Sequence, residues 1–145
     1  MTVVFSSDHA GFQLRERLAA HARENGYEVI VVGAPSEDAY DYPDAADEGV
    51  AVIKRGEAEF GVFVCGSGVG ICMRANRHLG IRGAPVTTVE AAKLTREHNN
   101  ANVLCFGQRT IDPEVAIDVM DAFLAAPTSG EDRHKRRVGK LDGNV

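Results

Sequence analysis

The feature that most constrains the fold is a regular alternation between short apolar runs and longer amphipathic segments. The runs are rich in β-branched residues and have the length of buried strands, whereas the segments carry apolar residues at helical spacing. Near-continuous apolar strands are typical of a parallel sheet that helices cover on both faces. The expected strands are residues 3–6, 28–32, 60–64, 80–85 and 101–106, and the expected helices are residues 12–25, 45–55, 72–79, 88–97, 113–124 and 132–141. The sequence therefore predicts an α/β protein: one three-layer α/β/α Rossmann-like domain, residues 1–145, with a five-stranded parallel sheet.

Local signals support several of these boundaries. Gly26 is well placed to end the first helix, and Pro43 suits the opening turn of the second. Thr87 or Thr88 would cap the helix that follows the fourth strand, and Pro85 should lie at the end of that strand. The last helix belongs to a basic tail of about residues 131–141, which holds five basic side chains between residues 133 and 140.

Composition excludes several classes of function. The formal charge of -5 argues against general affinity for nucleic acid, whose phosphate backbone attracts a basic face. No apolar run approaches the length of a membrane span, and no signal peptide is recognised. The three cysteines have neither disulfide-framework nor zinc-site spacing. We expect a cytoplasmic protein with no metal, cofactor, membrane or nucleic-acid partner.

The richest motif is Cys65-Gly-Ser-Gly-Val-Gly-Ile71, where a strand runs into a cysteine followed by three glycines at alternate positions. A glycine-rich turn between a strand and a helix leaves several backbone N–H groups free, and such groups attract anions. The same field favours a thiolate over a thiol. A thiolate beside an anion hole suits a base that removes a carbon-bound proton while amides hold the resulting enediolate oxygen.

Other phosphate-binding turns fit this motif less well. A Rossmann fingerprint needs its third glycine one residue later than Gly70. A Walker loop ends in Gly-Lys-Ser/Thr, which is not present, and a cysteine phosphatase would carry arginine where Ile71 stands. These three alternatives are therefore weakened.

Each candidate side chain also has an ordinary structural role open to it. Cys65 could be a packed thiol, and this is the expected role of Cys72 and Cys105. Asp8 and His9 could simply cap the first helix. Surface positions are expected for His21 and His78, a helix-dipole role is open to His98, and the basic tail could be a solvated helix.

In these motifs the chain resembles the family of sugar-phosphate isomerases that contains ribose-5-phosphate isomerase type B and galactose-6-phosphate isomerase. The motifs that carry the resemblance occur in the family's order over about residues 3–138. Taken together, this ordered set is specific to the family. Its marks are Ser7-Asp-His-Ala-Gly11, Asp41-Tyr-Pro-Asp44, Cys65-Gly-Ser-Gly-Val-Gly-Ile71, Ala75-Asn76, Gly80-Ile-Arg82, His98-Asn99, Asn102-Val-Leu104, Phe106-Gly-Gln-Arg109, Arg133-His134 and Arg137-Val138.

The resemblance implies an aldose–ketose isomerase that needs no metal and acts through a cis-enediolate. Its first expected reaction interconverts D-ribose 5-phosphate and D-ribulose 5-phosphate, in the pentose phosphate pathway. Allose 6-phosphate or galactose 6-phosphate are alternative substrates. A nucleotide- or cofactor-using enzyme, and a non-catalytic sugar-phosphate-binding subunit, remain rival functions.

The resemblance also assigns roles to residues. Cys65 would be the base, with Ser67 assisting it, and Asp8 and His98 would open the furanose ring. The expected substrate-binding residues are His9, Tyr42, Gly66, Gly68, Val69, Gly70, Asn99, Arg109, Arg133 and Arg137, of which His9 and the arginines would hold the phosphate. A homodimer, or a dimer of dimers, is implied in which the basic tail reaches the partner's site. Ser67 stands where relatives often carry threonine, and the loop 32–39 and the segment 87–91 also depart from the family pattern.

Overall fold

A computed structural model describes residues 1–143 and contains one five-stranded sheet in which every described pairing is parallel. The strand order is β2-β1-β3-β5-β4, which confirms the predicted fold class. The strands are β1 (Thr2–Ser7), β2 (Glu28–Gly33), β3 (Phe60–Cys65), β4 (Gly83–Ala84) and β5 (Val103–Gly107).

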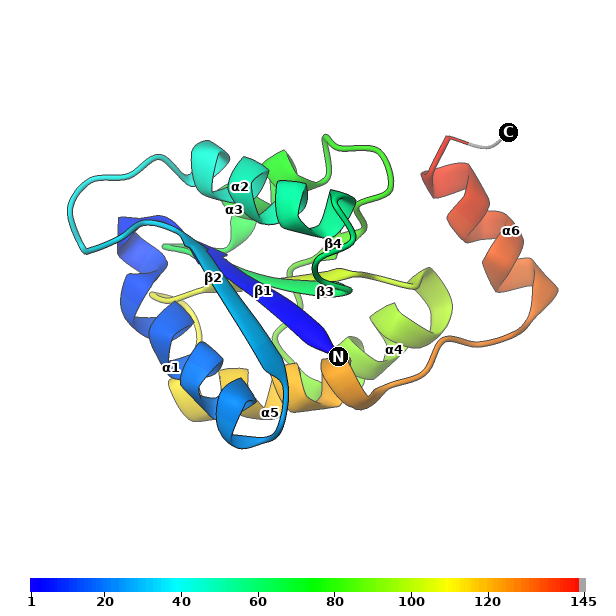
Figure 1. The fold of residues 1–145 in the computed structure, drawn as a ribbon. Coiled ribbons are helices and arrows are strands. Elements are labelled where there is room, and N and C mark those ends of the chain that lie inside the picture. The colour runs from blue at the N-terminus through cyan, green and yellow to red at the C-terminus, as the bar shows by residue number, and fades with distance from the viewer. Residues whose placement is uncertain (144–145) are drawn as a thin grey trace.

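Helices cover both faces of this sheet (Figure 1). One face packs against α1, α4 and α5, and the other against α2 and α3. A short 3₁₀ turn, η1 (His9–Gly11), precedes α1. The helices are α1 (Phe12–Glu24), α2 (Tyr42–Lys54), α3 (Val69–Ala75), α4 (Val89–Asn99), α5 (Pro113–Ala125) and α6 (Asp132–Leu141).

The two-residue period of the strands divides the core between the faces. On β3, Val62 and Val64 point to the α1/α4/α5 side, whereas Phe63 and Cys65 point to the α2/α3 side. All four side chains are almost completely buried. The alternation explains why β3 reads as continuously apolar, and it directs the Cys65 side chain toward the layer that holds α3.

The segment after β3 differs from the prediction. The helix begins at Val69 rather than residue 72 and ends at Ala75 rather than 79, and the fourth strand is only Gly83–Ala84. The side-chain amide of Asn76 is responsible for part of this, because it donates to the carbonyl of Gly83 and accepts from its N–H group. Asn102 likewise accepts from the N–H of Arg82. Side-chain amides thus replace ladder hydrogen bonds, and the strand stays short.

The predicted bounds of the tail helix are confirmed, and α6 stands apart from the layered body (Figure 1). It contacts α4, and at its C-terminal end Asp142 pairs with the guanidinium of Arg82 at 2.9 Å. The cap at Thr88 is confirmed as well, since its hydroxyl accepts from the N–H of Ala91. Among residues 1–143, no helix combines the length and apolar character that crossing a membrane requires.

Candidate active site

The carboxyl ends of three neighbouring strands meet at one edge of the sheet. In the register, Ser7 on β1 lies beside Val64, and Cys65 on β3 lies beside Gly107. From β1 the chain returns along α1 on one face, and from β2 it returns along α2 on the other. The boundary between β1 and β3 is therefore the switch point at which parallel sheets usually bind ligands.

A cavity of about 380 Å³ opens at this edge. Asp8 reaches it from the end of β1, Cys65 from the end of β3, and Arg109 from the loop after β5. Nine of its ten lining residues were predicted site residues, and the exception is Ala10. The lining is Asp8, His9, Ala10, Tyr42, Cys65, Gly66, Ser67, Val69, Gly70 and Arg109.

Cys65 lies in the wall of this cavity with only 4% of its surface exposed. Its sulfur accepts a hydrogen bond from the N–H of Gly68, with a nitrogen–sulfur distance of 3.1 Å. Ser67 is exposed at the turn, and its hydroxyl accepts from the N–H of Val69 at 3.3 Å. The turn therefore brings a potential base and several backbone donors together.

The alternate glycines leave room for two other site residues. A Cβ on Gly66 would lie 2.9 Å from Nη1 of Arg109, and a Cβ on Gly70 would lie 2.6 Å from the ring of Tyr42. Contacts this short do not occur between real atoms, so any larger residue would displace these side chains. The glycine spacing thus lets a guanidinium and a phenol ring lie directly against the turn.

Asp8 combines the two roles that the sequence allowed. It is buried, and its Oδ1 accepts from the N–H of Gly11 at 3.0 Å, which caps η1. It also lines the cavity. The capping role is therefore found for Asp8 alone, at the 3₁₀ turn that leads into α1 rather than at α1 itself, whose N-cap is Gly11, and it fixes the carboxylate in the cavity wall.

His9 is held by a residue that sequence reasoning missed. The N–H of Tyr40 donates to Nδ1 of His9 at 3.1 Å. Tyr40 is itself anchored because its hydroxyl donates to Glu48, whose other oxygen accepts from the N–H of Gly33. The hydrogen bond to Glu48 raises the pKa of Tyr40 to about 12. The only signal in the sequence was an aromatic residue within an acidic loop.

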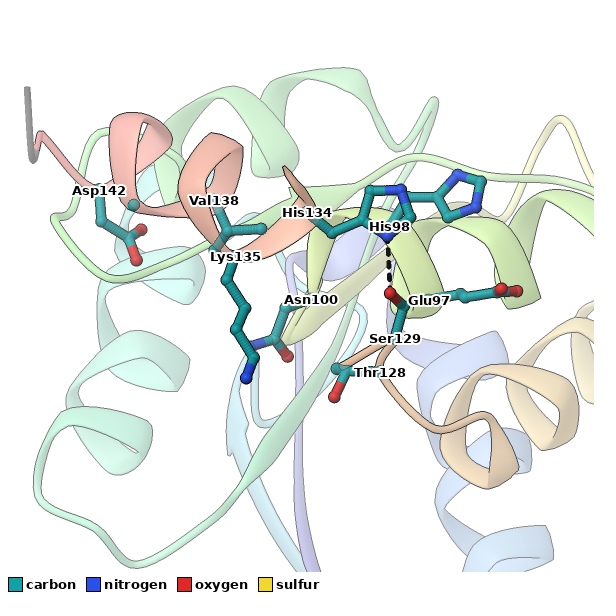
Figure 2. Close-up of a pocket in the computed structure, with 10 residues that line it drawn as sticks. Glu97, His98, Asn100, Thr128, Ser129, His134, Lys135, Val138 and Asp142 are labelled. Atoms are coloured by element: carbon teal, nitrogen blue, oxygen red, sulfur yellow. Dashed lines mark hydrogen bonds between the residues drawn. The ribbon is translucent and has the colours of Figure 1, made fainter. Parts of the chain in front are cut away.

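The other predicted site residues lie elsewhere in the chain. His98 lines a second cavity, of about 310 Å³, between α4, α6 and the loop that joins α5 to α6 (Figure 2). Asn99, Arg133 and Arg137 are exposed and line neither cavity. The second cavity is lined by Glu97, His98, Asn100, Thr128, Ser129, His134, Lys135, Val138, Gly139 and Asp142. A single chain therefore divides the predicted site into a Cys65 group and a His98 group.

The other two cysteines are packed in the core, and two further histidines pair with carboxylates. Cys72 and Cys105 are buried in the core beneath the glycine turn, as predicted. Their mutual hydrogen bond, together with burial, raises the pKa of Cys105 well above its usual range, and the same hydrogen bond lowers that of Cys72. His21 pairs with Asp121, and His78 pairs with Asp47. His78 was expected within a helix over residues 72–79 but lies beyond the end of α3. Within residues 1–143, no group of three or more His, Cys, Asp or Glu side chains could hold a metal ion.

Comparison with known proteins relates this geometry to a family. The family described as Ribose/Galactose Isomerase matches residues 3–141. Ribose-5-phosphate isomerase B of Escherichia coli is 40% identical over 136 residues, which cover 94% of this chain and 91% of that protein.

Solved structures agree along the full length. A ribose 5-phosphate isomerase from Thermotoga maritima has 42% identity and a TM-score of 0.95, over 98% of this chain and 97% of that chain. The type B ribose 5-phosphate isomerase of Trypanosoma brucei has 40% identity and a TM-score of 0.94, over 99% and 98%. With the Cys65 group of predicted residues on the expected edge of the sheet, and a family match over nearly the whole chain, the chain belongs to the ribose/galactose isomerase family.

Proposed function

We propose that this protein is an aldose–ketose isomerase that interconverts D-ribose 5-phosphate and D-ribulose 5-phosphate, with Cys65 as the base. Family membership and the names of the similar proteins support the reaction. The observation that carries the proposed chemistry is the sulfur of Cys65, which accepts an amide hydrogen bond in the wall of a cavity shared with Asp8 and Arg109.

The proposed reaction moves one proton between two carbons. In the open-chain aldose, the Cys65 thiolate removes the proton from C2. The electron pair of that C–H bond forms the C1–C2 double bond, and the aldehyde oxygen becomes the enediolate oxygen. Backbone N–H groups of residues 66–70 lie beside Cys65 and would stabilise this oxygen. The proton of the C2 hydroxyl then passes to the C1 oxygen, and the thiol returns its proton to C1 as the C2 carbonyl forms, which gives the ketose.

The charged end of the substrate would lie at the rim of the cavity. His9 and Arg109 both line it and are exposed, so they can pair with phosphate oxygens. Arginine suits this role because its planar guanidinium donates parallel hydrogen bonds to phosphate. The ring of Tyr42 lies against Gly70 in the wall of the same cavity and would line the sugar pocket.

The His98 group would be supplied by a second copy of the chain. We propose a homodimer in which His98, Asn99, Arg133 and Arg137 of one chain complete the Cys65 cavity of the other. His98 and Asp8 would open the furanose ring, Asn99 would orient the open chain, and the two arginines would join the phosphate site. Exposed apolar side chains on α3 support an interface beside the cavity, because Val69, which lines the cavity, is 49% exposed and Met73 on the same helix is 65% exposed.

The chemistry is tested by replacing the base. Cys65→Ala should lower kcat for ribose 5-phosphate by about 10²-fold or more, with substrate affinity within a few-fold of wild type, because a general base acts in the transition state. Cys72→Ala is the matched control, since it removes a thiol from the same core without touching the cavity. Wild-type turnover in Cys65→Ala would show that Cys65 is not the base.

The shared site is tested by mixing two inactive variants. If Cys65 and His98 act from different chains, unfolding and refolding Cys65→Ala with His98→Ala would form heterodimers that each hold one intact site. Equal amounts should recover about a quarter of the wild-type activity, since half of the dimers are mixed and half of their sites are intact. If no activity returns although mixed dimers form, both residues act within one chain.

The family description includes galactose, so a hexose phosphate is a second candidate substrate. A coupled assay of the purified chain on ribose 5-phosphate, allose 6-phosphate and galactose 6-phosphate, without added metal, ranks the substrates by kcat/KM. Turnover by the purified chain alone would also exclude a non-catalytic subunit.

A further inference from the structure

The tail helix α6 buries one residue, His134, which is 7% exposed in an otherwise accessible basic helix. Its ring lies against the ring of His98 on α4, with centroids 4.5 Å apart and planes inclined by 33° (Figure 2). This arrangement is within the range of stacked aromatic pairs. The side chain that α6 buries therefore contacts the imidazole to which the proposed function assigns ring opening.

A short chain of hydrogen bonds holds His134 in place. Nδ1 of His134 and the hydroxyl oxygen of Ser129 are 2.7 Å apart, the contact drawn as a dashed line in Figure 2. The N–H of Glu131 donates to the same oxygen at 3.0 Å, and the N–H of Ser129 donates to the carbonyl of Glu97 at 2.9 Å. Because Glu97 directly precedes His98, the stacking partner is anchored to the turn of α4 that carries His98.

The tautomer of His134 fits these contacts. Nε of Arg133 donates to Nε2 of His134 at 3.4 Å, so Nε2 serves as an acceptor. Nδ1 then carries the proton and donates to Ser129. Both ring nitrogens of His134 are thus occupied, by Ser129 and by Arg133, and only the face of its ring is directed at His98.

We infer that His134 is the positioning residue of His98. This inference rests on the proposed function, in which His98 acts on the ring oxygen of the furanose. A general acid must lie within hydrogen-bond reach of the atom that it protonates. His98 is half-buried at the end of α4, and the stack with His134 fixes the plane and position of its imidazole.

A role in packing alone does not explain why residue 134 is a histidine. The C-terminal end of α6 is already held by the pair between Arg82 and Asp142. A side chain that only filled the space against α4 could be apolar. It would then have no ring nitrogen and would need no hydrogen-bond partner. The observed residue instead has its ring orientation specified by Ser129 and its face directed at His98.

The two chemical steps can be measured separately. Ribulose 5-phosphate cannot close to a furanose because its C5 oxygen carries the phosphate. Entry of deuterium from D₂O at its C1 therefore reports proton transfer by Cys65 without ring opening. Conversion of ribose 5-phosphate, which is mostly a closed ring, requires both steps.

The test compares these rates in His134→Ala, His134→Phe and Ser129→Ala, with His21→Ala as the control for loss of a histidine on another helix. His134→Ala should lower kcat for ribose 5-phosphate by about 10- to 100-fold, because a small displacement of an acid is costly. Deuterium entry at C1 should stay within about two-fold of wild type, and His134→Phe should recover part of the conversion by keeping the stack. Ser129→Ala should show the same split more weakly, and it carries the test if His134→Ala does not fold.

If conversion and deuterium entry fall together, or if neither falls, His134 does not position His98. A different result would count against the proposed function itself: no deuterium entry with the wild-type protein, or undiminished entry with Cys65→Ala.

Discussion

A methyl group on Gly68 is expected to destabilise the protein by about 2–5 kcal/mol. Gly68 has φ +79°, and this left-handed conformation costs a residue with a Cβ about 1–2 kcal/mol. The added Cβ would also lie 2.8 Å from the nitrogen of Gly107 and from the carbonyl carbon of Phe106. Both are backbone atoms of β5 and cannot rotate away, so overpacking adds about 1–3 kcal/mol.

Gly26→Ala is the matched control for this substitution. Gly26 has a similar φ of +89°, but a Cβ there would meet no atom within 4 Å. This variant should therefore carry the conformational cost alone. Thermal unfolding measures the difference, at about 2–4 °C of Tm for each kcal/mol in a chain of this size.

The two variants should also differ in activity. The N–H of Gly68 donates to the sulfur of Cys65, so moving the turn weakens that hydrogen bond and lowers kcat well below the transition temperature. Gly26 follows the last turn of α1 and lies near the start of β2, at the edge of the sheet opposite the cavity. Gly26→Ala should therefore leave kcat unchanged. Equal losses of Tm in the two variants would refute the claim that β5 leaves no room for a side chain at the turn.

Three further predictions concern side-chain contacts outside the Cys65 cavity. Asp142→Asn should speed hydrogen exchange of the α6 amides, because it weakens the pair with Arg82; unchanged exchange would show that the pair does not hold the helix. The guanidinium of Arg74 lowers the pKa of Asp47 below its ordinary 3.8, so the stability lost in Asp47→Asn should be full above about pH 4 and vanish as pH falls through the lowered pKa. Urea unfolding across pH tests this, and a pH-independent difference would contradict it. Cys105, with its raised pKa and complete burial, should resist iodoacetamide in the folded protein, as peptide mass spectrometry would reveal.

The fold was predictable because it depends on patterns that each segment carries by itself. The apolar runs 28–32 and 60–64 alternate with amphipathic segments, and a parallel sheet covered on both faces is the arrangement that buries them all. The Cys65 half of the site was predictable for a related reason. Parallel strands bring their carboxyl ends to one edge, so Asp8 and Cys65 had to lie close together.

The errors and omissions lie where side chains or loop paths decide the structure. The bounds of α3 and β4 depend on the amide of Asn76, which bonds Gly83 seven residues later. The support of His9 by Tyr40 depends on the path of the acidic loop, which has no periodic pattern. The separation of His98 from Cys65 within one chain was equally invisible, because motif order does not specify distance in space.

Contacts at the two ends of α6 explain how this basic helix can be ordered while its arginine side chains stay exposed. A helix of ten residues is marginal on its own in water, and this one buries a single side chain. Contacts at its two ends compensate: His134 stacks on α4 near the start, and Asp142 pairs with Arg82 beyond the last turn. Because neither contact uses Arg133 or Arg137 as its main anchor, both guanidinium groups remain exposed. A protein that is acidic overall thereby keeps a local cationic surface on α6, and the ring of His134 links the placement of that surface to the placement of His98.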